Sequence, residues 1–272
     1  MHIEIDFSKS VHENASLYFE KSKLAAKKRA RVVGAMKEVR ARADKEREKS
    51  VEKEKSKVVV RKRVKEWFEK FHWFHTSDNL LVIGGRDVES NEQVVKKHLE
   101  EGDLYFHADI HGASHCVLKT KNNQAPKKSV NEAAEFAAVF SKAWEQGIPV
   151  DVYSVLPNQV SKKAPSGEFV GKGAYIISGT RVWYKRVLPR FGVGVENVNG
   201  FARILSGPLN GLQSKNISCI EIVRGSHSKS DVAKQLHGLF SREFSSLSLD
   251  LDEIMSMLPN GLLGVKATGL KR

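Results

Sequence analysis

The sequence predicts an α+β fold: a mixed, mainly antiparallel sheet domain with packed helices, preceded by an antiparallel helical hairpin (coiled-coil) arm and followed by a small α/β extension. Two observations predict it. The first part of the chain lacks proline and repeats its apolar residues at helical spacing. The remainder alternates short apolar runs with turn signals and amphipathic segments. We expect the arm at residues 1–75, the sheet domain at 76–190 and the extension at 191–272.

The arm is expected to begin with a long helix over residues 9–50, which hold one glycine, Gly34. Residues 44–57 carry eleven charged side chains in fourteen positions, and an apolar seam with spacings of 4, 3 and 4 follows them. This pattern predicts an antiparallel hairpin with a charged tip, and the alternative is one long solvated helix. The stripe of the first helix is Leu17, Leu24, Val32, Met36, Val39 and Ala43, and the returning seam is Val60, Val64, Trp67 and Phe71.

The sheet domain is expected to open with a β-hairpin, because Trp73-Phe74 and the apolar run 80–85 flank a turn at Asp78-Asn79. Helical spacing predicts a helix over 88–101, and strands at 104–107 and 114–120 flank a His-Gly turn. Ser129 and Glu132 match a capping box, so a helix is expected from there to about Gly147. The remaining predicted elements are strands at 150–156, two around Gly179, 201–205 and 217–223, and helices at 229–242 and 249–258.

The net charge of the 272-residue chain is +13, and its distribution indicates the kind of partner. Residues 1–75 contain 21 lysines and arginines against 12 aspartates and glutamates, a net charge of +9. A basic extension of this kind usually binds a polyanion. Cys116 and Cys219 are far apart in apolar surroundings and are expected to be reduced core thiols. The amino terminus does not resemble a signal peptide, and no apolar run is long enough to span a bilayer, so we predict a cytoplasmic protein without a membrane partner.

Histidines and an acidic residue cluster between Phe106 and Lys119, where His107, Asp109 and His111 occupy alternate positions of an extended segment. Alternate residues share one face of a strand, and such polar groups are costly to bury without partners. The cluster could be a metal site, an acid–base site, a recognition site for a polar ligand, or a hydrogen-bonded turn that includes Ser114. The glycines at 84–85 lack the spacing of phosphate and dinucleotide loops, and no cofactor is predicted.

A series of short segments, in order, resembles the NFACT family and its RNA-binding NFACT-R domain. These segments are Trp67–Phe71, Trp73–Phe74, Gly84–Asp87, Asn91–Glu92, Gly102–Asp103, His107–Asp109, His111–Ser114, Asn131–Ala133, Ala143–Trp144, Gln159–Lys162, Ala164–Pro165 and Gly167–Glu168. Residues 5–18 and the basic helix resemble the family's coiled-coil middle region, and residues 190–272 resemble the carboxy-terminal extension of archaeal-type members. No part of the chain matches the NFACT-N portion. Tyr153 and Ser154 stand where many members carry paired tryptophans, which argues against base stacking there.

The resemblance implies a ribosome quality control factor that binds large ribosomal subunits with stalled nascent chains and helps recruit tRNA for tailing. Its implied partners are tRNA, large-subunit rRNA and the large subunit itself, without an enzymatic step. We predict that Arg86, His107, Asp109 and His111 lie together beside the basic loop at 158–168. The full set of predicted RNA-binding residues is Arg86, Asn91, Lys96, His107, Asp109, His111, Ser114, Lys162 and Lys163.

Two other classes of function remain open from the residues alone. In the first, a metal-dependent nuclease or hydrolase would use His107, Asp109 and His111 as ligands. In the second, a protein-interaction module would use the coiled coil as a seam, including one for a homo-oligomer. Metal analysis of the purified protein distinguishes the metal-dependent enzyme from an RNA-binding protein. Partner binding that persists after nuclease treatment distinguishes the protein-interaction module from an RNA-binding protein.

Overall fold

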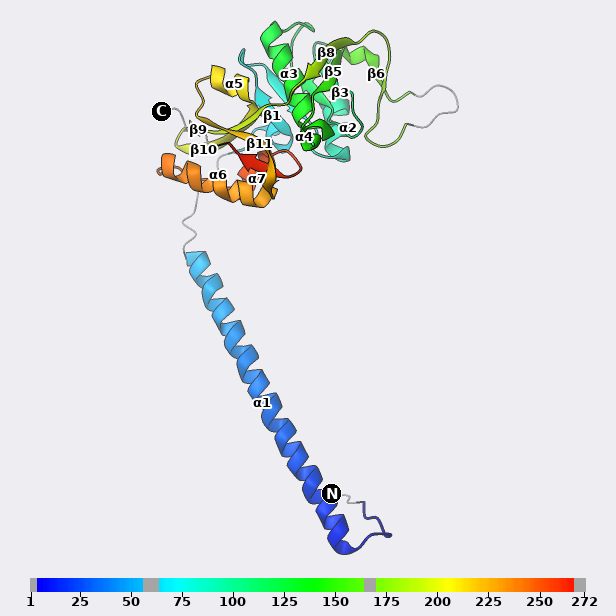
Figure 1. The fold of residues 1–272 in the computed structure, drawn as a ribbon, viewed down its shortest axis with the longest axis vertical. Coiled ribbons are helices and arrows are strands. Elements are labelled where there is room, and N and C mark those ends of the chain that lie inside the picture. Colours follow the sequence, from blue (N-terminus) through cyan, green and yellow to red (C-terminus); the bar gives the residue numbers. More distant parts are fainter. Residues whose placement is uncertain (1–3, 56–63, 164–169, 267–272) are drawn as a thin grey trace. The chain divides into compact units, whose positions relative to one another are not determined.

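The computed structural model describes residues 4–55, 64–163 and 170–266. It divides into two compact units, residues 1–61 and residues 62–272, which are described separately (Figure 1). This division precedes the expected boundary at residue 75, because β1 (His72–His75) pairs with β2 (Leu81–Gly84) inside the second unit.

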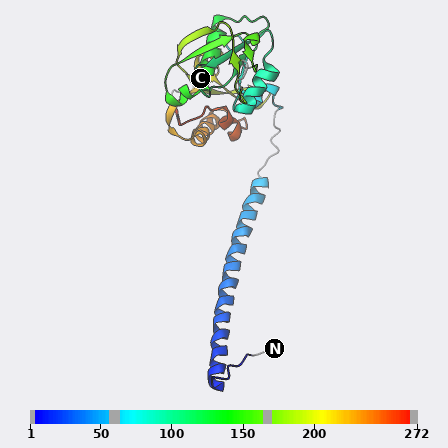
Figure 2. The same ribbon diagram turned by 90° about the vertical axis from the view of Figure 1, so that its right-hand side faces the viewer.

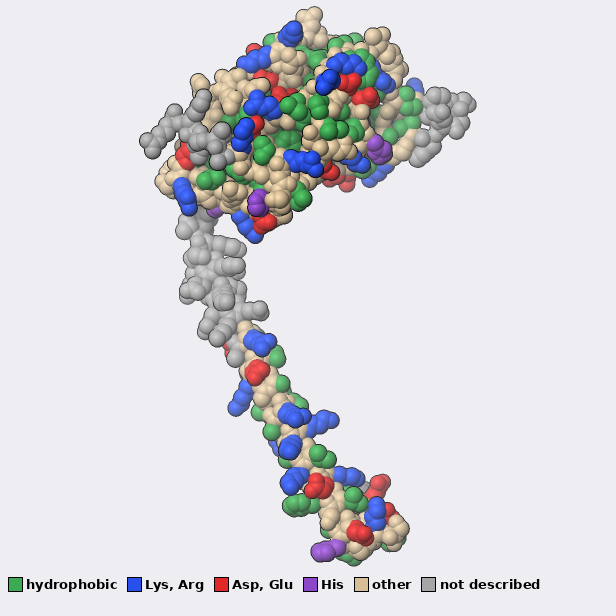
Figure 3. All heavy atoms as spheres, in the orientation of Figure 1, with side chains coloured by type: hydrophobic (Ala, Val, Ile, Leu, Met, Phe, Trp, Pro, Cys, Tyr) green, Lys and Arg blue, Asp and Glu red, His purple; other side chains and the backbone are tan. Residues whose placement is uncertain are grey.

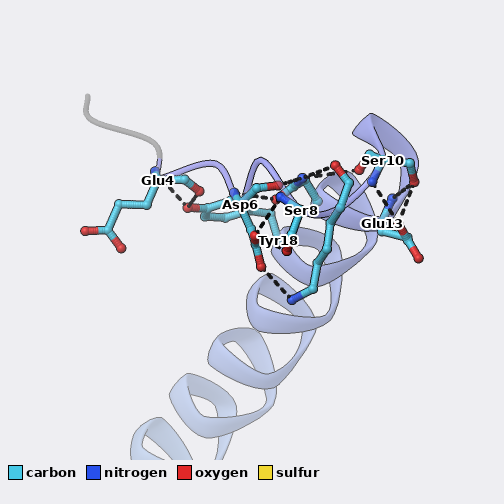
Figure 4. A network of polar contacts seen from close by, with 8 residues as sticks. Glu4, Asp6, Ser8, Ser10, Glu13 and Tyr18 are labelled. Atoms are coloured by element: carbon cyan, nitrogen blue, oxygen red, sulfur yellow. Dashed lines mark hydrogen bonds and ion pairs between the residues drawn. The ribbon is translucent and has the colours of Figure 1, made fainter.

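The described part of the first unit is dominated by one helix, α1 (Val11–Lys55), which confirms the predicted long helix. A reciprocal capping box begins it: the Ser10 backbone N–H donates to the Glu13 carboxylate at 2.8 Å, and the Glu13 N–H donates to the Ser10 hydroxyl at 3.3 Å. Residues 4–10 fold back on this end (Figure 4), where the Tyr18 hydroxyl donates to the Glu4 carbonyl at 2.8 Å and accepts from its N–H at 3.0 Å. The bond from Glu13 satisfies one of the N–H groups that the first turn of a helix leaves without partners.

The predicted return helix of the hairpin is wrong over residues 64–71, whereas residues 60–63 lie outside the described part. A four-residue 3-10 helix, η1 (Trp67–Lys70), stands in its place. Its apolar side chains pack into the second unit: Phe68 lies 4.9 Å from the Trp73 ring, and Phe71 is 1% exposed. Among the described residues of the predicted seam only Phe71 is buried, while Val64 is 94% exposed, so the helical spacing does not correspond to a helix here.

The second unit contains a six-stranded sheet in the order β1-β2-β4-β3-β5-β8, in which every neighbouring pair is antiparallel. This arrangement confirms the predicted hairpin and the strands on both sides of the His-Gly turn. A separate two-stranded ribbon, β6 with β7, flanks it. The further strands are β3 (Leu104–Ala108), β4 (Cys116–Leu118), β5 (Val150–Val155), β6 (Val160–Ser161), β7 (Ile176–Ile177) and β8 (Val182–Val187), and η2 is Pro157–Gln159.

Helices α2 (Val88–His98), α3 (Lys127–Val139) and α4 (Lys142–Gln146) accompany this sheet. The predicted capping box at Ser129 and Glu132 is wrong, since α3 begins at Lys127 and Ser129 lies inside it, with its hydroxyl donating to Asp78 at 2.6 Å. The predicted single helix is also interrupted: Ser141 caps α4, accepting from the Ala143 N–H at 3.2 Å.

A four-stranded antiparallel sheet, in the order β10-β9-β11-β12, forms the rest of the unit (Figure 2). The strands predicted at 201–205 and 217–223 and both late helices are confirmed, whereas β9, α5 and β12 were not foreseen. The elements are β9 (Phe191–Val198), β10 (Phe201–Pro208), α5 (Leu209–Ser214), β11 (Cys219–His227), α6 (Lys229–Glu243), α7 (Leu251–Met257) and β12 (Leu263–Val265).

One continuous apolar core joins the two larger sheets of this unit. Phe191 of β9 is fully buried, and its ring lies 5.8 Å from Phe140 and 6.0 Å from Trp144. Both cysteines are free, and Cys116 is buried as predicted. The α+β fold class is confirmed. Within the described residues, no helix is both long and apolar enough to cross a membrane.

Candidate functional site

The two faces of the six-stranded sheet have different roles. Because successive side chains alternate between faces, Phe106 points into the main core, while Tyr105 and His107 share the opposite face. On that face His107 is paired in register with Tyr153 of β5, and Tyr153 with Trp183 of β8. The sequence therefore places an aromatic or imidazole ring at the same level of three neighbouring strands.

These rings form a continuous row that we call the aromatic row. Ring centroids are separated by 5.3 Å between Tyr175 and His115, 5.1 Å between His115 and His107, 5.8 Å between His107 and Tyr153, and 5.4 Å between Tyr153 and Trp183. Tyr153 is 6% exposed, whereas Trp183 at the sheet edge is 37% exposed. The sequence offered Tyr153 and Ser154 in place of paired tryptophans; the structure pairs Tyr153 with Trp183, a ring from a different strand.

The outer end of the aromatic row carries positive charge. The Arg181 guanidinium lies 4.8 Å from the Tyr153 ring centroid and 5.8 Å from that of Trp183, and the Lys185 ammonium lies 4.4 Å from Trp183. Lys185 also forms an ion pair with Asp151 at 2.8 Å. β8 is an edge strand of the sheet, so this group of rings and cations faces solvent on one side.

His115 is fixed at the inner end of the row by three hydrogen bonds. Its Nε2 lies 2.7 Å from the Gly173 carbonyl, which can only accept, so Nε2 carries the proton. Nδ1 then accepts from the Tyr105 hydroxyl. The backbone N–H of His115 donates to Asn91 Oδ1 at 2.9 Å. The ring is thus held as a neutral tautomer of defined orientation.

Burial keeps the imidazoles of His72, His107 and His115 uncharged. Desolvation, with His115 as the next cause, lowers the pKa of His107 to about 3. Desolvation also lowers the pKa of His115, and it lowers that of the buried His72 well below the usual range. At neutral pH these rings are therefore uncharged; the Nδ1 atoms of His72 and His107 have no partner, whereas both nitrogens of His115 are bonded within the protein.

A cavity of 690 Å³ opens beside the inner end of the row. Five of the nine predicted residues line it, which confirms that the motif segments converge: Arg86, Asn91, His107, His111 and Ser114. The cavity also receives the side chains of His72, Tyr105, His115, Lys142, Tyr153, Lys172 and Tyr175, together with Asp87 and Glu145. Figure 3 shows one side of the molecule, with lysine and arginine side chains spread over it.

Asp109 does not line the cavity. The alternating pattern that grouped it with His107 and His111 assumes a continuous strand, but β3 ends at Ala108 and the chain turns at Asp109 to Gly112. Asp109 is exposed, so it does not share a face with the two histidines. Within the part of the chain that the structure describes, no group of three or more His, Cys, Asp or Glu side chains is placed to hold a metal ion.

Some of the predicted residues hold the site together. The Ser114 hydroxyl donates to the Gly85 carbonyl at 2.7 Å, and Asn91 accepts from His115. A Cβ at Gly85 would lie 2.6 Å from the Asn91 backbone nitrogen, so only glycine lets the loop approach α2 this closely. One Arg86 amino group donates to the Phe71 carbonyl at 2.9 Å, anchoring the segment before β1.

The predicted lysines differ in their surroundings. Glu92 pairs with Lys162 at 2.5 Å and with Lys96 at 3.0 Å. The Lys162 ammonium also lies 4.8 Å from the Tyr175 ring centroid, so it joins the 170–175 loop to α2. Lys163 is exposed. The remainder of the predicted basic loop, residues 164–168, lies outside the described residues.

Glu92 gives the site a specific acid sensitivity. The hydrogen bond from Lys162 first, and then those from the Gly173 N–H and Lys96, lower its pKa from 4.5 to about 2. A carboxylate whose pKa is lowered in the folded state stabilises the protein above the unfolded pKa of 4.5, and this stabilisation is lost as pH falls through about 2.

We expect Glu92→Gln to lower the melting temperature at pH 6, and the difference in melting temperature from the parent protein to shrink towards pH 2. Thermal denaturation between these values measures this, with Glu89→Gln on the same helix as control. A deficit independent of pH contradicts it.

Several site residues were missed from the sequence, and His115 is the most central. The pairing of Phe106 with Cys116 across the β3–β4 hairpin places residues 107 and 115 next to each other, so the register of this hairpin could have identified it. Trp183, Lys142 and Lys172 come from segments far apart in the chain, and no local pattern relates them.

Comparisons with known proteins point to one family. The profile described as the NFACT protein RNA binding domain matches residues 70–179. The chain is 34% identical over 212 residues to the archaeal Rqc2 homologue aRqcH of Methanocaldococcus jannaschii, covering 76% of this chain and 31% of that protein. It is 37% identical over 172 residues to the human ribosome quality control complex subunit NEMF, covering 62% of this chain and 16% of that protein.

Similarity extends to the Drosophila melanogaster NEMF homologue, at 34% identity over 181 residues, 66% of this chain and 18% of that protein. The chain thus spans less than a third of each of these relatives. All three relatives are named as ribosome quality control factors or their homologues and not as enzymes. The match at residues 70–179 contains β1–β5, the cavity histidines and the strand Ile176–Ile177, whereas β8, with Trp183 at the outer end of the aromatic row, follows it. The chain therefore belongs to the NFACT family and carries its RNA-binding domain.

Proposed function

We propose that the second unit binds RNA through the face that carries the aromatic row and the cavity. The observation that supports this most directly is the row itself, in which partly exposed Trp183 is flanked by Arg181 and Lys185. Unpaired bases stack on aromatic and guanidinium planes, and cations beside them attract the phosphates. The neutral imidazoles can exchange hydrogen bonds with base edges or 2′-hydroxyls.

Within this proposal the predicted residues have two roles. His107, His111 and Lys163 contact RNA, and so does Arg86, whose amino group is bonded to the Phe71 carbonyl but whose Nε has no partner. Asn91, Ser114, Lys96 and Lys162 position the elements that make those contacts, because their polar groups already have partners within the protein. Asp109 has no contact with the nucleotides at the cavity, since it lies outside its lining.

We further propose that this RNA-binding unit belongs to a ribosome quality control factor, which the names of its relatives support, and that this factor is cytoplasmic. The proposed ligands are tRNA and the rRNA of large subunits that retain a stalled nascent chain, and the proposed role is to help recruit tRNA for tailing. A factor of this kind has to bind RNA reversibly. Base stacking and ionic contacts with phosphates allow this without a covalent step.

The role of the row is tested by Trp183→Ala, which removes the exposed ring of the platform. Stacking contributes about 1–3 kcal/mol per base, so the affinity for single-stranded RNA or tRNA should fall by roughly 5-fold to 150-fold. Trp183→Phe should retain much of it. Fluorescence anisotropy with labelled RNA measures the affinity, and Val182→Ala, which truncates the exposed neighbour on β8, is the control. If Trp183→Ala and the parent protein bind RNA with equal affinity, the RNA-binding surface lies elsewhere.

A second candidate function, association with a helical partner, is favoured by the surface of α1. Its apolar side chains remain exposed, with Leu24 at 65%, Val32 at 53% and Met36 at 67%. A stripe of this kind usually packs against another helix. Sedimentation of the nuclease-treated protein tests whether it forms a homo-oligomer through this stripe, and Val32→Gln with Met36→Gln should abolish any such association.

A further inference from the structure

We propose that the 690 Å³ cavity beside His107 and His115 receives one unstacked nucleotide of the bound RNA, taking its base among the imidazoles and its phosphate at the lysines of the rim. This inference rests on the proposed RNA-binding function and adds to it a pocket for a single nucleotide. The cavity volume lies within the range of roughly 300–1,000 Å³ that is usual for small-ligand sites.

The first argument comes from unsatisfied polar atoms. Seven buried side-chain nitrogen or oxygen atoms in the described residues lack a hydrogen-bond partner, and four belong to residues that line this one cavity. They are His72 Nδ1, Arg86 Nε, His107 Nδ1 and Tyr175 Oη. Such atoms cost free energy unless a ligand or water satisfies them. Their concentration at one cavity, with His72 only 8% exposed, indicates a binding site for a polar ligand.

The second argument concerns the chemistry of that ligand. Burial lowers the pKa values of His72, His107 and His115, so these rings are neutral. Both ring nitrogens of His115 are bonded to Gly173 and Tyr105, whereas the Nδ1 atoms of His72 and His107 and the Tyr175 hydroxyl have no partner and can serve as donors or acceptors. The edges of nucleobases carry the same mixture of donors and acceptors on a flat ring. The partly exposed Tyr175 adds a flat apolar surface against which such a ring can pack. A planar heterocycle matches this interior better than a sugar or an aliphatic chain does.

The third argument is the position of the positive charges. Lys142 and Lys172 line the cavity but are exposed themselves, and Arg86 lies deeper, where burial lowers its pKa. A ligand with a flat interior part and an anionic outer part fits this distribution. Asp87 and Glu145 also line the cavity, so its charge is mixed. The phosphate of the ligand is therefore expected beside Lys142 and Lys172. A nucleoside monophosphate unit has this combination.

The proposal is tested by titrating the full chain with AMP, CMP, GMP and UMP, with the corresponding nucleosides, and with inorganic phosphate. Binding is followed by NMR of the imidazole C2 protons. At least one nucleotide should shift the His107 and His115 signals, and its nucleoside and phosphate alone should bind at least tenfold more weakly. Lys142→Ala with Lys172→Ala should weaken nucleotide binding at least tenfold, whereas Lys97→Ala with Lys121→Ala, two exposed lysines outside the lining, should not. Tyr175→Phe, which removes only a hydroxyl without a partner, should weaken it without lowering the melting temperature.

The outcomes separate this inference from the proposed function. If RNA binds and Trp183→Ala weakens it, but no mononucleotide shifts the histidine signals, the pocket is refuted and RNA binding stands. If mononucleotides bind but the lysine and Tyr175 variants leave their affinity unchanged, they bind elsewhere and the pocket is again refuted. If neither RNA nor any mononucleotide binds, both proposals fail.

Discussion

RNA affinity is expected to fall steeply with salt, and the cations of α1 are expected to account for much of the slope. Lys23, Lys27 and Arg31 are exposed and spaced four residues apart, so they follow one face of the helix. Each phosphate contact contributes about 0.7 to the logarithmic salt slope with single strands. Replacing all three by glutamine should therefore lower the slope by up to about 2. The affinity should fall most at low salt, where counterion release contributes most.

Substitution is preferable to deletion of the whole predicted arm, because residues up to 75 include β1 of the large sheet. A matched control removes the same charge from the second unit, at Lys121, Lys234 and Arg242, which are exposed and lie outside the cavity and β8. Affinities measured over a range of salt concentrations give both slopes. Equal slopes for the α1 variant and the parent protein would show that the helix does not contact RNA.

The largest loss of stability is expected from Phe191→Ala. Phe191 is fully buried between the two larger sheets, in contact with the rings of Phe140 and Trp144. Truncating a buried phenylalanine costs about 3–5 kcal/mol through lost burial and the remaining cavity. All four tryptophans of the chain, Trp67, Trp73, Trp144 and Trp183, lie in the second unit, so their fluorescence during urea denaturation reports on that unit alone.

The second unit is expected to unfold in a single transition in both the parent protein and the Phe191→Ala variant, because residues 191–266 share one apolar core with the six-stranded sheet and its helices. The predicted carboxy-terminal extension would then unfold together with the RNA-binding domain. Phe201→Ala, on the neighbouring strand β10 at a partly exposed position, is the control and should cost much less. Two separate transitions, or a loss for Phe191→Ala no greater than that for Phe201→Ala, would show that the extension is an independent domain.

The family relationship explains why much of the site could be anticipated. The segments that resemble NFACT-R contain Arg86, Asn91, His107, His111 and Ser114, and the fold brings all five to one cavity. Their individual roles do not follow from that resemblance. Asn91 and Ser114 are hydrogen-bonded to His115 and Gly85, and for this reason we propose a positioning role for these two residues in place of the RNA contact predicted from the sequence.

The sequence by itself determined the elements that local physics specifies. A regular helical period with no proline predicts α1, and strand, turn and helix patterns predict most of the second unit, because these depend on neighbours within a few residues. The concentration of positive charge in the first quarter of the chain is likewise a property of composition, and it needs no fold to be recognised.

Only the tertiary structure decided which side chains meet. The apolar residues Trp67 and Phe71 obey helical spacing, yet this segment forms a 3-10 helix in which Phe68 packs on Trp73, Phe71 is buried and Trp67 stays half exposed. Asp109 leaves the histidine face because β3 ends one residue earlier, and Lys162 is held by Glu92, seventy residues away in the chain. The aromatic row exists because strand register aligns His107, Tyr153 and Trp183 across three strands. Register and long-range pairing depend on the whole core, and no local pattern contains them.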